Sequence, residues 1–174
     1  MLDLLRKRRS VRRFLERPIE AEKVELLIEA LLRSPSSKGR NPWEFIIVTD
    51  PEQRAKLAAA KPRGGSFVAN APLAIVVCAD PDKCDVWVED CSIAAIILQL
   101  AALELGLGSC WSQIRKRNHI DGDPSSDYLC QQLNLPDRYE VEAIIGIGYP
   151  LEEKAGHDKN SLAYNKIHRN VFGS

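Results

Sequence analysis

The sequence predicts a domain in which helices cover a small β-sheet, of the α/β or the α+β class. Helical periodicity through residues 17–37 is one observation behind this prediction. Apolar, β-prone runs at 44–48, 73–79 and 140–150 are the second, and a stretch at 86–105 that is apolar on nearly every side of a helix is the third. Helices and strands are mixed along the chain, and its 174 residues contain no repeat or flexible linker that would divide them.

Two helices are expected before the first strand. Residues 2–9 form a short helix that carries leucines. In the stretch RPIEAEKVELLIEALLRSPSS the apolar residues recur at the i, i+3, i+4, i+7 spacing of one buried face, and Pro35 ends the helix. The residues of this face are Val24, Leu27, Ile28 and Leu31.

The first strand and the helix after it follow from composition. EFIIV at 44–48 is a continuous apolar run, which is typical of a strand covered on both faces. Asp50 is suited to cap a helix and Pro51 to occupy its first turn, so a helix is expected to about Ala60. Residues 61–72 carry two glycines and two prolines and are expected to form a loop.

The second half of the chain holds the other predicted strands. LAIVVCA at 73–79 is a second buried strand, and EVEAIIGIGYP at 140–150 is a third. Between them lie the central buried helix at 86–105, which Gly106 closes, and a short helix in DYLCQQL. The tail from Lys154 is polar and ends in NKIHRNVF.

Composition limits the classes of function. The 24 Lys and Arg balance 24 Asp and Glu, whereas a protein that follows a nucleic acid backbone usually carries a basic excess. The five cysteines form no CxxC pair and the three histidines have no ligand-like spacing, so we expect free thiols and no metal site. No apolar run reaches the roughly 18 residues that cross a bilayer. The early charges leave no room for a signal peptide, so a cytoplasmic protein is expected.

One short stretch, RKRRSVRRF at residues 6–14, concentrates positive charge. Alternate residues of an extended segment point the same way, so Arg8, Ser10 and Arg12 would present two guanidinium groups and a hydroxyl to one site. Arginine binds phosphate through two parallel hydrogen bonds and serine adds a compact donor, which suits a phosphomonoester better than a duplex. Because the excess charge is local, it favours a small anion over a polymer.

The chain carries no recognisable set of catalytic side chains. The motifs GxSxG and HExxH, a Walker loop and the spaced glycines of dinucleotide-binding folds are absent. GLGSCW at 106–111 contains GxG, but it follows a predicted helix rather than a strand. We therefore assign no catalytic residue and expect a bound cofactor to supply the reactive atoms if the protein is an enzyme.

Several separated stretches agree on one family. RRSVRRF resembles the flavin-phosphate segment that opens the FMN-dependent nitroreductase family, and SPSSKGRNPWEFIIV resembles that family's S-P-S-S-x-N-x-Q-P-W segment. AALELGLGSCW, IIGIGYP and the terminal NKIHRNVF resemble its later landmarks in the same order. The resemblance runs from about residue 2 to the end of the chain.

The resemblance implies an α+β fold, namely a nitroreductase-like three-layer α/β/α sandwich with a small, mostly antiparallel sheet around a central buried helix. Residues 1–174 would form a single FMN-binding domain. Two copies would form a homodimer with the flavin at the interface, held by both chains.

The resemblance also implies which residues bind FMN. Arg8 and Ser10 would hold the phosphate and ribityl chain with Arg9 beside them, and Arg12 would approach the N1 and C2 carbonyl edge of the flavin. Ser112 and Gln113 align with the loop whose backbone N–H faces flavin N5. The other candidates are Pro35, Ser36 and Ser37 from the partner chain, and Lys166, His168 and Arg169 of the tail at the phosphate.

The sequence departs from the family pattern at several positions. Gly39 and Asn41 stand where the family has Asn and Gln, which leaves one side-chain contact to flavin or substrate open. Gly64 or Gly65 stands where other members place a flavin-contacting side chain. The loop around Trp111 carries a bulky aromatic residue and a Gln where several members have Pro and Glu. These departures concern substrate access more than flavin binding.

The expected function is that of an FMN-dependent oxidoreductase. NAD(P)H would reduce the flavin, and a small-molecule acceptor such as a nitroaromatic, a quinone or a related electrophile would take the electrons. Two alternatives stay open: the same flavin fold also supports reductive dehalogenation, alkene reduction and flavin fragmentation, and a non-catalytic module would bind nucleic acid through the Arg cluster. Neutral net charge and few aromatic residues argue against the latter, so neither nucleic acid nor a membrane is expected as partner.

Overall fold

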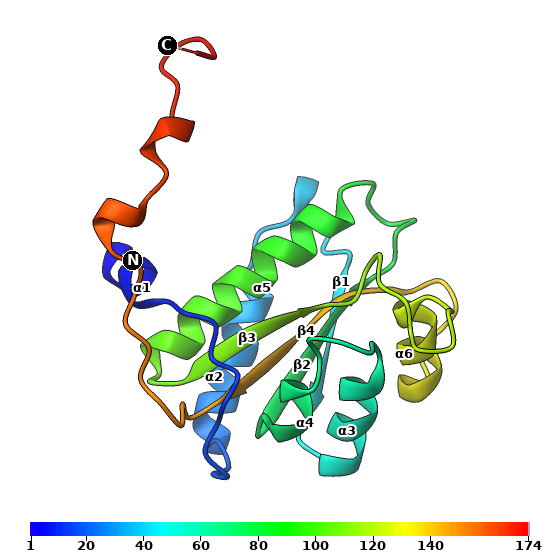
Figure 1. The fold of residues 1–174 in the computed structure, drawn as a ribbon. Coiled ribbons are helices and arrows are strands. Elements are labelled where there is room, and N and C mark those ends of the chain that lie inside the picture. Colours follow the sequence, from blue (N-terminus) through cyan, green and yellow to red (C-terminus); the bar gives the residue numbers. More distant parts are fainter. Residues whose placement is uncertain (174) are drawn as a thin grey trace.

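Apolar and mostly β-branched residues build an antiparallel sheet at the centre of the chain. The computed structural model describes residues 1–173 (Figure 1). The sheet has four strands in the spatial order β1-β2-β4-β3, and every neighbouring pair is antiparallel. The strands are β1 (Trp43–Val48), β2 (Leu73–Ala79), β3 (Gly108–Gln113) and β4 (Glu140–Gly148). The central strands β2 and β4 are almost wholly buried, while β1 and β3 form the edges.

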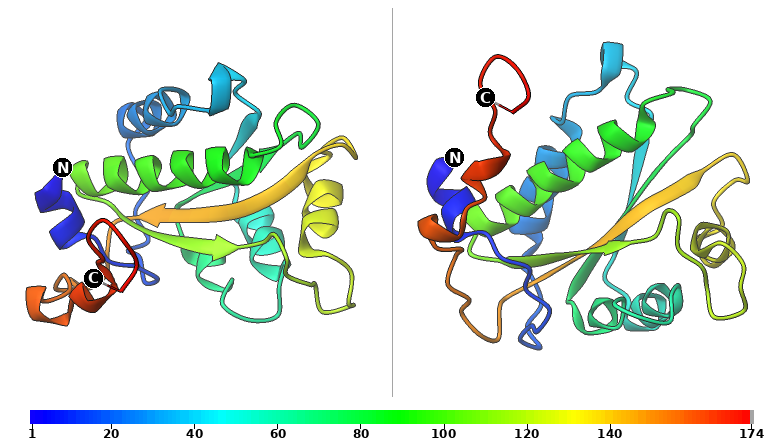
Figure 2. Two further views of the ribbon diagram at one scale, coloured as in Figure 1. Left: turned by 90° about the horizontal axis from the view of Figure 1, so that it is seen from above. Right: turned by 45° about the horizontal axis from the view of Figure 1, so that its top comes forward.

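Helices cover both faces of this sheet, so the chain has three layers (Figures 1 and 2). Helices α2 (Ala21–Leu32) and α5 (Trp87–Glu104) lie on one face, and the short α1 (Leu2–Lys7) lies beside α5. The other face carries α3 (Pro51–Ala59), α4 (Phe67–Asn70) and α6 (Ser125–Leu133). Successive strand side chains point to opposite faces, so each layer of helices packs on its own hydrophobic core. The expected α+β fold with a small antiparallel sheet is confirmed.

Local sequence signals explain where two of the helices begin or end. The Asp50 carboxylate accepts a hydrogen bond from the backbone N–H of Gln53 at 2.8 Å, and Pro51 occupies the first turn of α3, as predicted. Helix α5 ends before Gly106, whose φ of +77° lies in the left-handed region that glycine adopts most readily. The predicted limits of both helices are thus confirmed to within a residue or two.

The predicted face of α2 is buried at Leu27 and Leu31 and half-buried at Val24 and Ile28. The helix is shorter than the stretch that predicted it, because it ends three residues before Pro35. The residue before a proline is disfavoured in a helix, so the chain leaves the helical conformation ahead of that proline.

The structure corrects three predictions. Residues 108–113 form strand β3, which the sequence did not indicate because GSCWSQ has little β propensity; pairing with β4 overrides that weakness. The predicted loop at 61–72 contains the helical turn α4, which buries Phe67 and Val68. Strand β1 is not covered on both faces, since it is an edge strand whose central residues are only half-buried.

Helix α5 is central, but it is not covered on every side within this chain. Its side chains Ile93 and Ile96 are 40% and 38% exposed. Helix α2 covers only part of the outer surface of α5, so this apolar strip stays partly exposed to solvent. None of the helices in the described part of the chain, residues 1–173, has the length and apolar character needed to cross a membrane.

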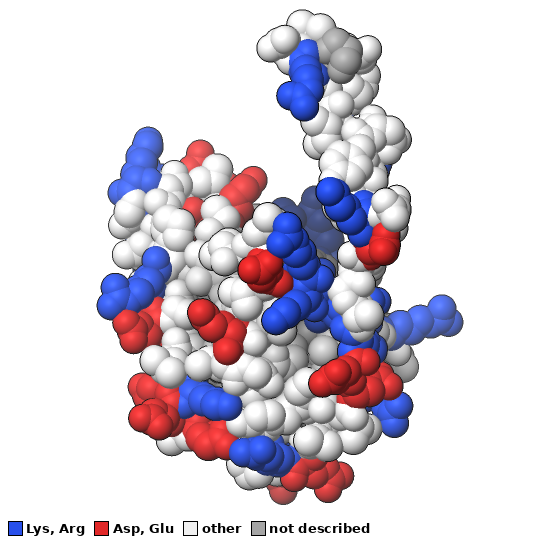
Figure 3. All heavy atoms as spheres, turned by 90° about the vertical axis from the view of Figure 1, so that its left-hand side faces the viewer, with Lys and Arg blue, Asp and Glu red and all other residues white. Residues whose placement is uncertain are grey.

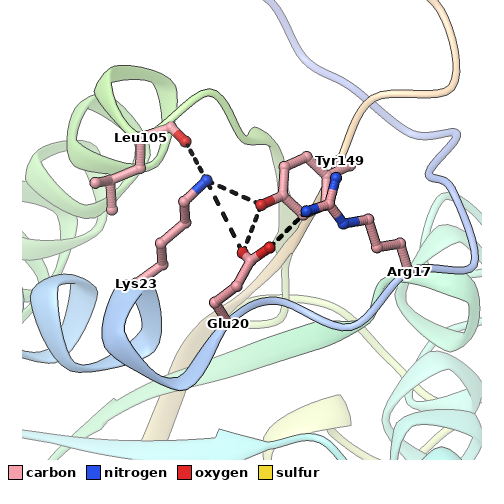
Figure 4. A network of polar contacts seen from close by, with 5 residues as sticks. All are labelled: Arg17, Glu20, Lys23, Leu105 and Tyr149. Carbon is pink, nitrogen blue, oxygen red and sulfur yellow. Dashed lines mark hydrogen bonds and ion pairs between the residues drawn. The ribbon is translucent and has the colours of Figure 1, made fainter.

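A polar network joins the start of α2 to the ends of α5 and β4 (Figure 4). The Tyr149 hydroxyl donates a hydrogen bond to Glu20 at 2.5 Å. Lys23 donates to this hydroxyl at 2.9 Å and to the backbone oxygen of Leu105 at 3.0 Å. The Arg17 guanidinium donates to Glu20 at 2.6 Å and lies 4.1 Å from the centroid of the Tyr149 ring. The network fixes the chain where it enters α2.

We expect Glu20→Gln to lower stability in a pH-dependent way. The hydrogen bond from Tyr149, the backbone N–H of Glu20 and the Arg17 guanidinium lower the pKa of Glu20 from 4.5 to about 2. A carboxyl group with a lowered pKa stabilises the folded state fully above its unfolded pKa, and the stabilisation is lost as pH falls through the folded pKa. The melting temperature of the wild type should therefore exceed that of Glu20→Gln at neutral pH, and the difference should vanish near pH 2. A difference that does not change with pH would contradict this assignment.

Candidate functional site

The basic segment of residues 8–15 lies extended on the outer side of β3. The Val11 N–H donates to the Ser109 oxygen at 2.9 Å, and Ser10 forms a parallel β-bridge with Ser109. Gly108 permits this contact, because a Cβ built on it would lie 2.8 Å from the Val11 side chain. A close approach of two backbones therefore positions the basic segment.

The basic segment is also bonded to the chain that follows β4. The Leu15 N–H donates to the Tyr149 oxygen at 2.9 Å, and the Leu151 N–H donates to the Arg13 oxygen at 3.0 Å. Bonds on both sides thus hold this segment in an extended conformation, and its alternate side chains must point in the same direction.

Side chains from several segments surround the Cys110 thiol. Burial raises the pKa of this thiol, and the Arg12 guanidinium, a hydrogen bond with Ser10 and the ammonium groups of Lys154 and Lys61 oppose the rise. Burial has the largest effect, so Cys110 remains a protonated thiol at neutral pH and is not an activated nucleophile. Ser10 and Arg12 thus both act on Cys110, which lies on β3 next to the residue that pairs with Ser10.

The outer edge of β3 is open beyond its first residues. Alternate residues of an antiparallel strand direct their backbone groups to opposite sides. The Ile114 N–H faces β4 and donates to Glu142 at 3.1 Å, whereas the Gln113 oxygen faces outward and accepts from Lys61 Nζ at 3.0 Å. The N–H groups of Trp111 and Gln113 therefore point outward, and no other strand among residues 1–173 pairs with them.

The structure separates the two predicted residues of β3. Ser112 is 1% exposed, lies opposite Ile144 of β4, and its hydroxyl has no hydrogen-bond partner within residues 1–173. The Gln113 carboxamide accepts from Trp111 Nε1 at 2.9 Å and donates to the Glu142 carboxyl at 3.4 Å. The backbone of Gln113, rather than its side chain, is therefore what faces the open edge.

The cations of the basic segment differ in their surroundings. The Arg9 guanidinium donates to the Ala155 oxygen at 2.5 Å, which ties the start of the tail to this segment. Arg8 is half-buried and Arg12 is exposed, and neither guanidinium has a hydrogen bond or a carboxylate partner among residues 1–173. Arg8 and Arg12 are therefore available to an anion from outside the chain.

The segment Pro35–Ser37 is positioned by α5. The Ser37 N–H donates at 2.8 Å to the buried carboxylate of Asp90, which lies in the first turn of α5. The Ser36 hydroxyl donates to Asn41 Oδ1 at 2.7 Å and accepts from the Asn41 N–H at 2.9 Å. Asn41, one of the departures from the family pattern, therefore closes this turn and engages the Ser36 hydroxyl.

Within one chain, the segment Pro35–Ser37 and the basic segment lie near opposite ends of α5 (Figures 1 and 2). Ser37 is bonded to the first turn of this helix, whereas Ser10 pairs with Ser109, which follows its last turn. The 18 residues of α5 extend about 27 Å at the usual helical rise. A single chain therefore does not bring these two sets of predicted residues together.

The C-terminal tail leaves the body of the protein beside α1 (Figure 1). Residues 157–173 are exposed throughout and contain two short turns, η2 (Lys159–Ser161) and η3 (Tyr164–Lys166). The predicted residues Lys166, His168 and Arg169 lie on this tail, and the His168 ring packs 4.3 Å from that of Phe172 within it. Figure 3 shows Lys and Arg side chains gathered around the place where the tail joins the body. In the described part of the chain no contact links Lys166 or His168 to Ser10.

Two cations of the site, Lys61 and Lys154, were not among the predicted residues. Lys61 follows α3 in the loop that holds Gly64 and Gly65. This loop was expected near the flavin, so the basic residues of KPRGG could have been predicted to belong to the site. Lys154 offered no such signal, because only folding brings the start of the tail next to Cys110.

The arrangement fits flavin mononucleotide. Guanidinium groups without a partner and a serine hydroxyl suit a phosphate, and outward N–H groups suit the carbonyl and ring-nitrogen acceptors of a flavin. Among residues 1–173, His, Cys, Asp and Glu nowhere gather in the groups of three or more that hold a metal ion. All five cysteines are free thiols, as expected.

Comparison with known proteins agrees with this chemistry. The family model described as "Nitroreductase family" matches residues 5–64 and 59–149. The solved structure of an FMN-dependent nitroreductase from Clostridium difficile R20291 has 47% identity and a TM-score of 0.96, over 99% of this chain and 100% of that one. An NADH dehydrogenase of Thermus thermophilus is 36% identical over 92% of this chain and 91% of its own length. A protein of Archaeoglobus fulgidus with the provisional name NADH dehydrogenase/NAD(P)H nitroreductase is 35% identical, over 97% of this chain and 96% of its own.

We expect Gly108→Ala to destabilise the protein by about 1–3 kcal/mol, the usual cost of overpacking, because its Cβ would collide with Val11. Val11→Gly removes the colliding side chain, so the double variant should lose much less stability than the sum of the two single losses. Urea denaturation of the wild type, both single variants and the double variant measures this coupling. Losses that add to within about 0.5 kcal/mol would show that Gly108 and Val11 do not constrain each other.

Proposed function

The chain belongs to the nitroreductase family, and we propose that it is an FMN-dependent enzyme that passes electrons from NAD(P)H to a small nitroaromatic, quinone or related electrophile. The names of similar proteins support this direction, since they include an FMN-dependent nitroreductase and an NADH dehydrogenase. The observation that carries the proposal is the open outer edge of β3 with unpartnered cations of the basic segment beside it.

The residues of this chain would bind and orient the cofactor. Arg8 and Ser10 would hold the phosphate, and the outward N–H groups of Trp111 and Gln113 would face acceptors on the flavin ring. Arg12 would lie at the electron-rich edge of the ring, where a fixed cation stabilises negative charge as it develops. Bound FMN would supply the two-electron chemistry that the side chains lack.

The side chains around the site contribute electrostatics rather than proton transfer. Burial keeps the Cys110 thiol protonated. Burial also raises the pKa of Glu142, whose carboxyl accepts from the Gln113 carboxamide and whose other oxygen has no partner among the described residues. Glu142 thus holds the Gln113 side chain away from the open edge and leaves the backbone N–H to face it.

A homodimer is part of the same proposal. Apolar side chains are exposed on α1, α2, α5 and the tail, and a second chain is the simplest cover for them. They are Leu2, Leu5, Leu26, Leu32, Ile93, Ile96, Ile167 and Phe172. A groove of about 800 Å³ also runs along the outer face of α2. A second chain would cover these surfaces, and obligate homodimer interfaces are large and apolar.

The dimer would also complete the site. The segment Pro35–Ser37 and the basic segment lie near opposite ends of α5 in one chain, so they would meet only across an interface with a partner. The tail extends from the body and would bring Lys166, His168 and Arg169 to the partner's phosphate. A two-fold axis would then give two equivalent flavin sites.

The purified protein is expected to be yellow, to release FMN on denaturation and to lose its colour when NADH or NADPH is added. The acceptors to be tested are a nitroaromatic, a quinone, an activated alkene and an iodinated phenol, which separate the proposed reaction from alkene reduction and dehalogenation.

In the apoprotein, Arg8→Ala should weaken FMN binding about ten- to a hundredfold, as expected for charge-assisted hydrogen bonds, and leave riboflavin binding unchanged.

Fluorescence titration measures both affinities, and Lys7→Ala, in the exposed neighbouring residue, is the matched control. Equal weakening of FMN and riboflavin by Arg8→Ala would remove Arg8 from the phosphate. A protein that binds neither ligand would contradict the proposed function itself.

Light scattering should give a mass of about twice the 19.5 kDa of the chain. Ile96→Glu, which places a charge on the exposed strip of α5, should convert the dimer to monomers and release FMN. Ile120→Glu is the control, because Ile120 is 75% exposed on a loop before α6 and should leave the mass unchanged. A monomeric wild type that retains FMN tightly would defeat both the interface and the shared site.

A further inference from the structure

Lys61 places a cation on the outer edge of β3. It follows α3, is half-buried, and its Nζ donates to the Gln113 oxygen at 3.0 Å. Its stem packs against Gly65, where an added Cβ would lie 3.4 Å from Lys61 Cγ. The ammonium group is therefore held beside the backbone that the proposed function sets against the flavin.

Arg117 brings a second cation to the end of β3. Its N–H donates to the Ile114 oxygen at 2.9 Å, and its own oxygen accepts from the Ser125 N–H at 2.8 Å. The backbone of Arg117 is therefore held between β3 and α6. Its guanidinium donates at 3.1 Å to the backbone oxygen of Lys116, which leaves further N–H donors for a ligand.

The two cations lie at the same end of β3, since Lys61 Nζ donates to the Gln113 oxygen and the Arg117 N–H donates to the oxygen of the next residue, Ile114. Burial is the largest cause of the lowered pKa of Lys61, and the positive charge of Arg117 is the next. No Asp or Glu within residues 1–173 forms an ion pair with either side chain. The neighbouring Arg115 is engaged elsewhere, since its guanidinium lies 5.6 Å from the centroid of the Trp87 ring and its positive charge attracts the Glu142 carboxyl group. Lys61 is half-buried and Arg117 is exposed, and an anion bound between them would relieve the repulsion of their charges.

We propose that Lys61 and Arg117 form a subsite for an anionic group, a carboxylate or a phosphate, on the molecule that exchanges electrons at the outer edge of β3. This subsite rests on the proposed function, and it is separate from the place of the FMN phosphate. Ser10 pairs with Ser109 near the start of β3, whereas Lys61 contacts Gln113 at its end, about 13 Å further along an extended strand. The enzyme would thereby favour acidic aromatic acceptors, or the phosphate groups of the nicotinamide nucleotide, over neutral reactants.

Calorimetric titration of the FMN-loaded protein, without an electron donor, tests the subsite directly. The ligands are para-nitrobenzoate and para-nitrobenzamide, which share a shape and differ in charge. Lys61→Met and Arg117→Gln should each weaken para-nitrobenzoate binding roughly tenfold, as expected for one charge-assisted hydrogen bond, and leave para-nitrobenzamide unchanged. Arg117→Lys should restore most of the affinity, and Arg63→Gln, which removes a charge from the same loop, should have no effect.

Steady-state kinetics with the same variants identifies the source of the anion. If the acceptor carries it, KM rises for para-nitrobenzoate and not for para-nitrobenzamide. If the nucleotide carries it, KM rises for NADPH or NADH and not for N-benzyl-dihydronicotinamide, a neutral donor. Equal effects on charged and neutral reactants, or no effect in either assay, would overturn the subsite.

The result also distinguishes the subsite from the proposed function. Suppose that the protein binds FMN, that the neutral donor reduces this FMN, and that the variants bind both nitro compounds with unchanged or equally changed affinity. The proposed subsite is then wrong, and the proposed function stands. If the protein holds no flavin but binds para-nitrobenzoate in a manner that depends on Lys61 and Arg117, the function is wrong and the anion site stands.

Discussion

The site depends on one close contact between two backbones, where residues 10–11 approach Gly108 and Ser109. Only a residue without a side chain permits the Val11 side chain to lie where it does. The approach pairs the basic segment with the start of β3, directs Ser10 and Arg12 toward Cys110, and ends before Trp111. A longer pairing would have covered the edge of β3, and a weaker one would have left the cations without a fixed position. The extent of this pairing therefore determines both the charge and the open backbone of the site.

Much of the fold could be predicted from the sequence, because its strongest local signals agree with the final packing. The cap at Asp50, the apolar run at 73–79 and the glycine after α5 each correspond to an element that begins or ends as expected. Strand β3 could not be found in this way, since GSCWSQ becomes a strand only through its pairing with β4. The edge of the sheet that carries the candidate site thus forms through contacts between distant residues.

The candidate site was likewise predictable where its residues are neighbours in sequence, and not where folding brings distant residues together. The basic segment was visible because its charges are adjacent in sequence, and the alternation of an extended chain predicted that Arg8, Ser10 and Arg12 point the same way. The sequence did not predict three other cations near β3, because no motif surrounds them in their own segments. They are Lys61, Lys154 and Arg117. Folding alone brings them near β3, and the neutral net charge of the chain does not reveal this local excess of positive charge. Net charge is a property of the whole chain, whereas the binding of a ligand depends on the charges next to it.

The open edge of β3 has a consequence for the life of the protein in the cell. An edge strand with unpaired N–H groups is a template on which a strand of another molecule can add, and such edges promote aggregation. A permanent strand on this edge would occupy the place that we propose for the flavin. Charged residues at its far end, including Lys61, discourage the approach of another strand, but they do not satisfy the outward N–H groups of Trp111 and Gln113. A flavin bound there would act as a cap on the sheet. Newly made chains would then be most prone to aggregate when FMN is scarce. The supply of FMN would therefore influence the yield of folded protein.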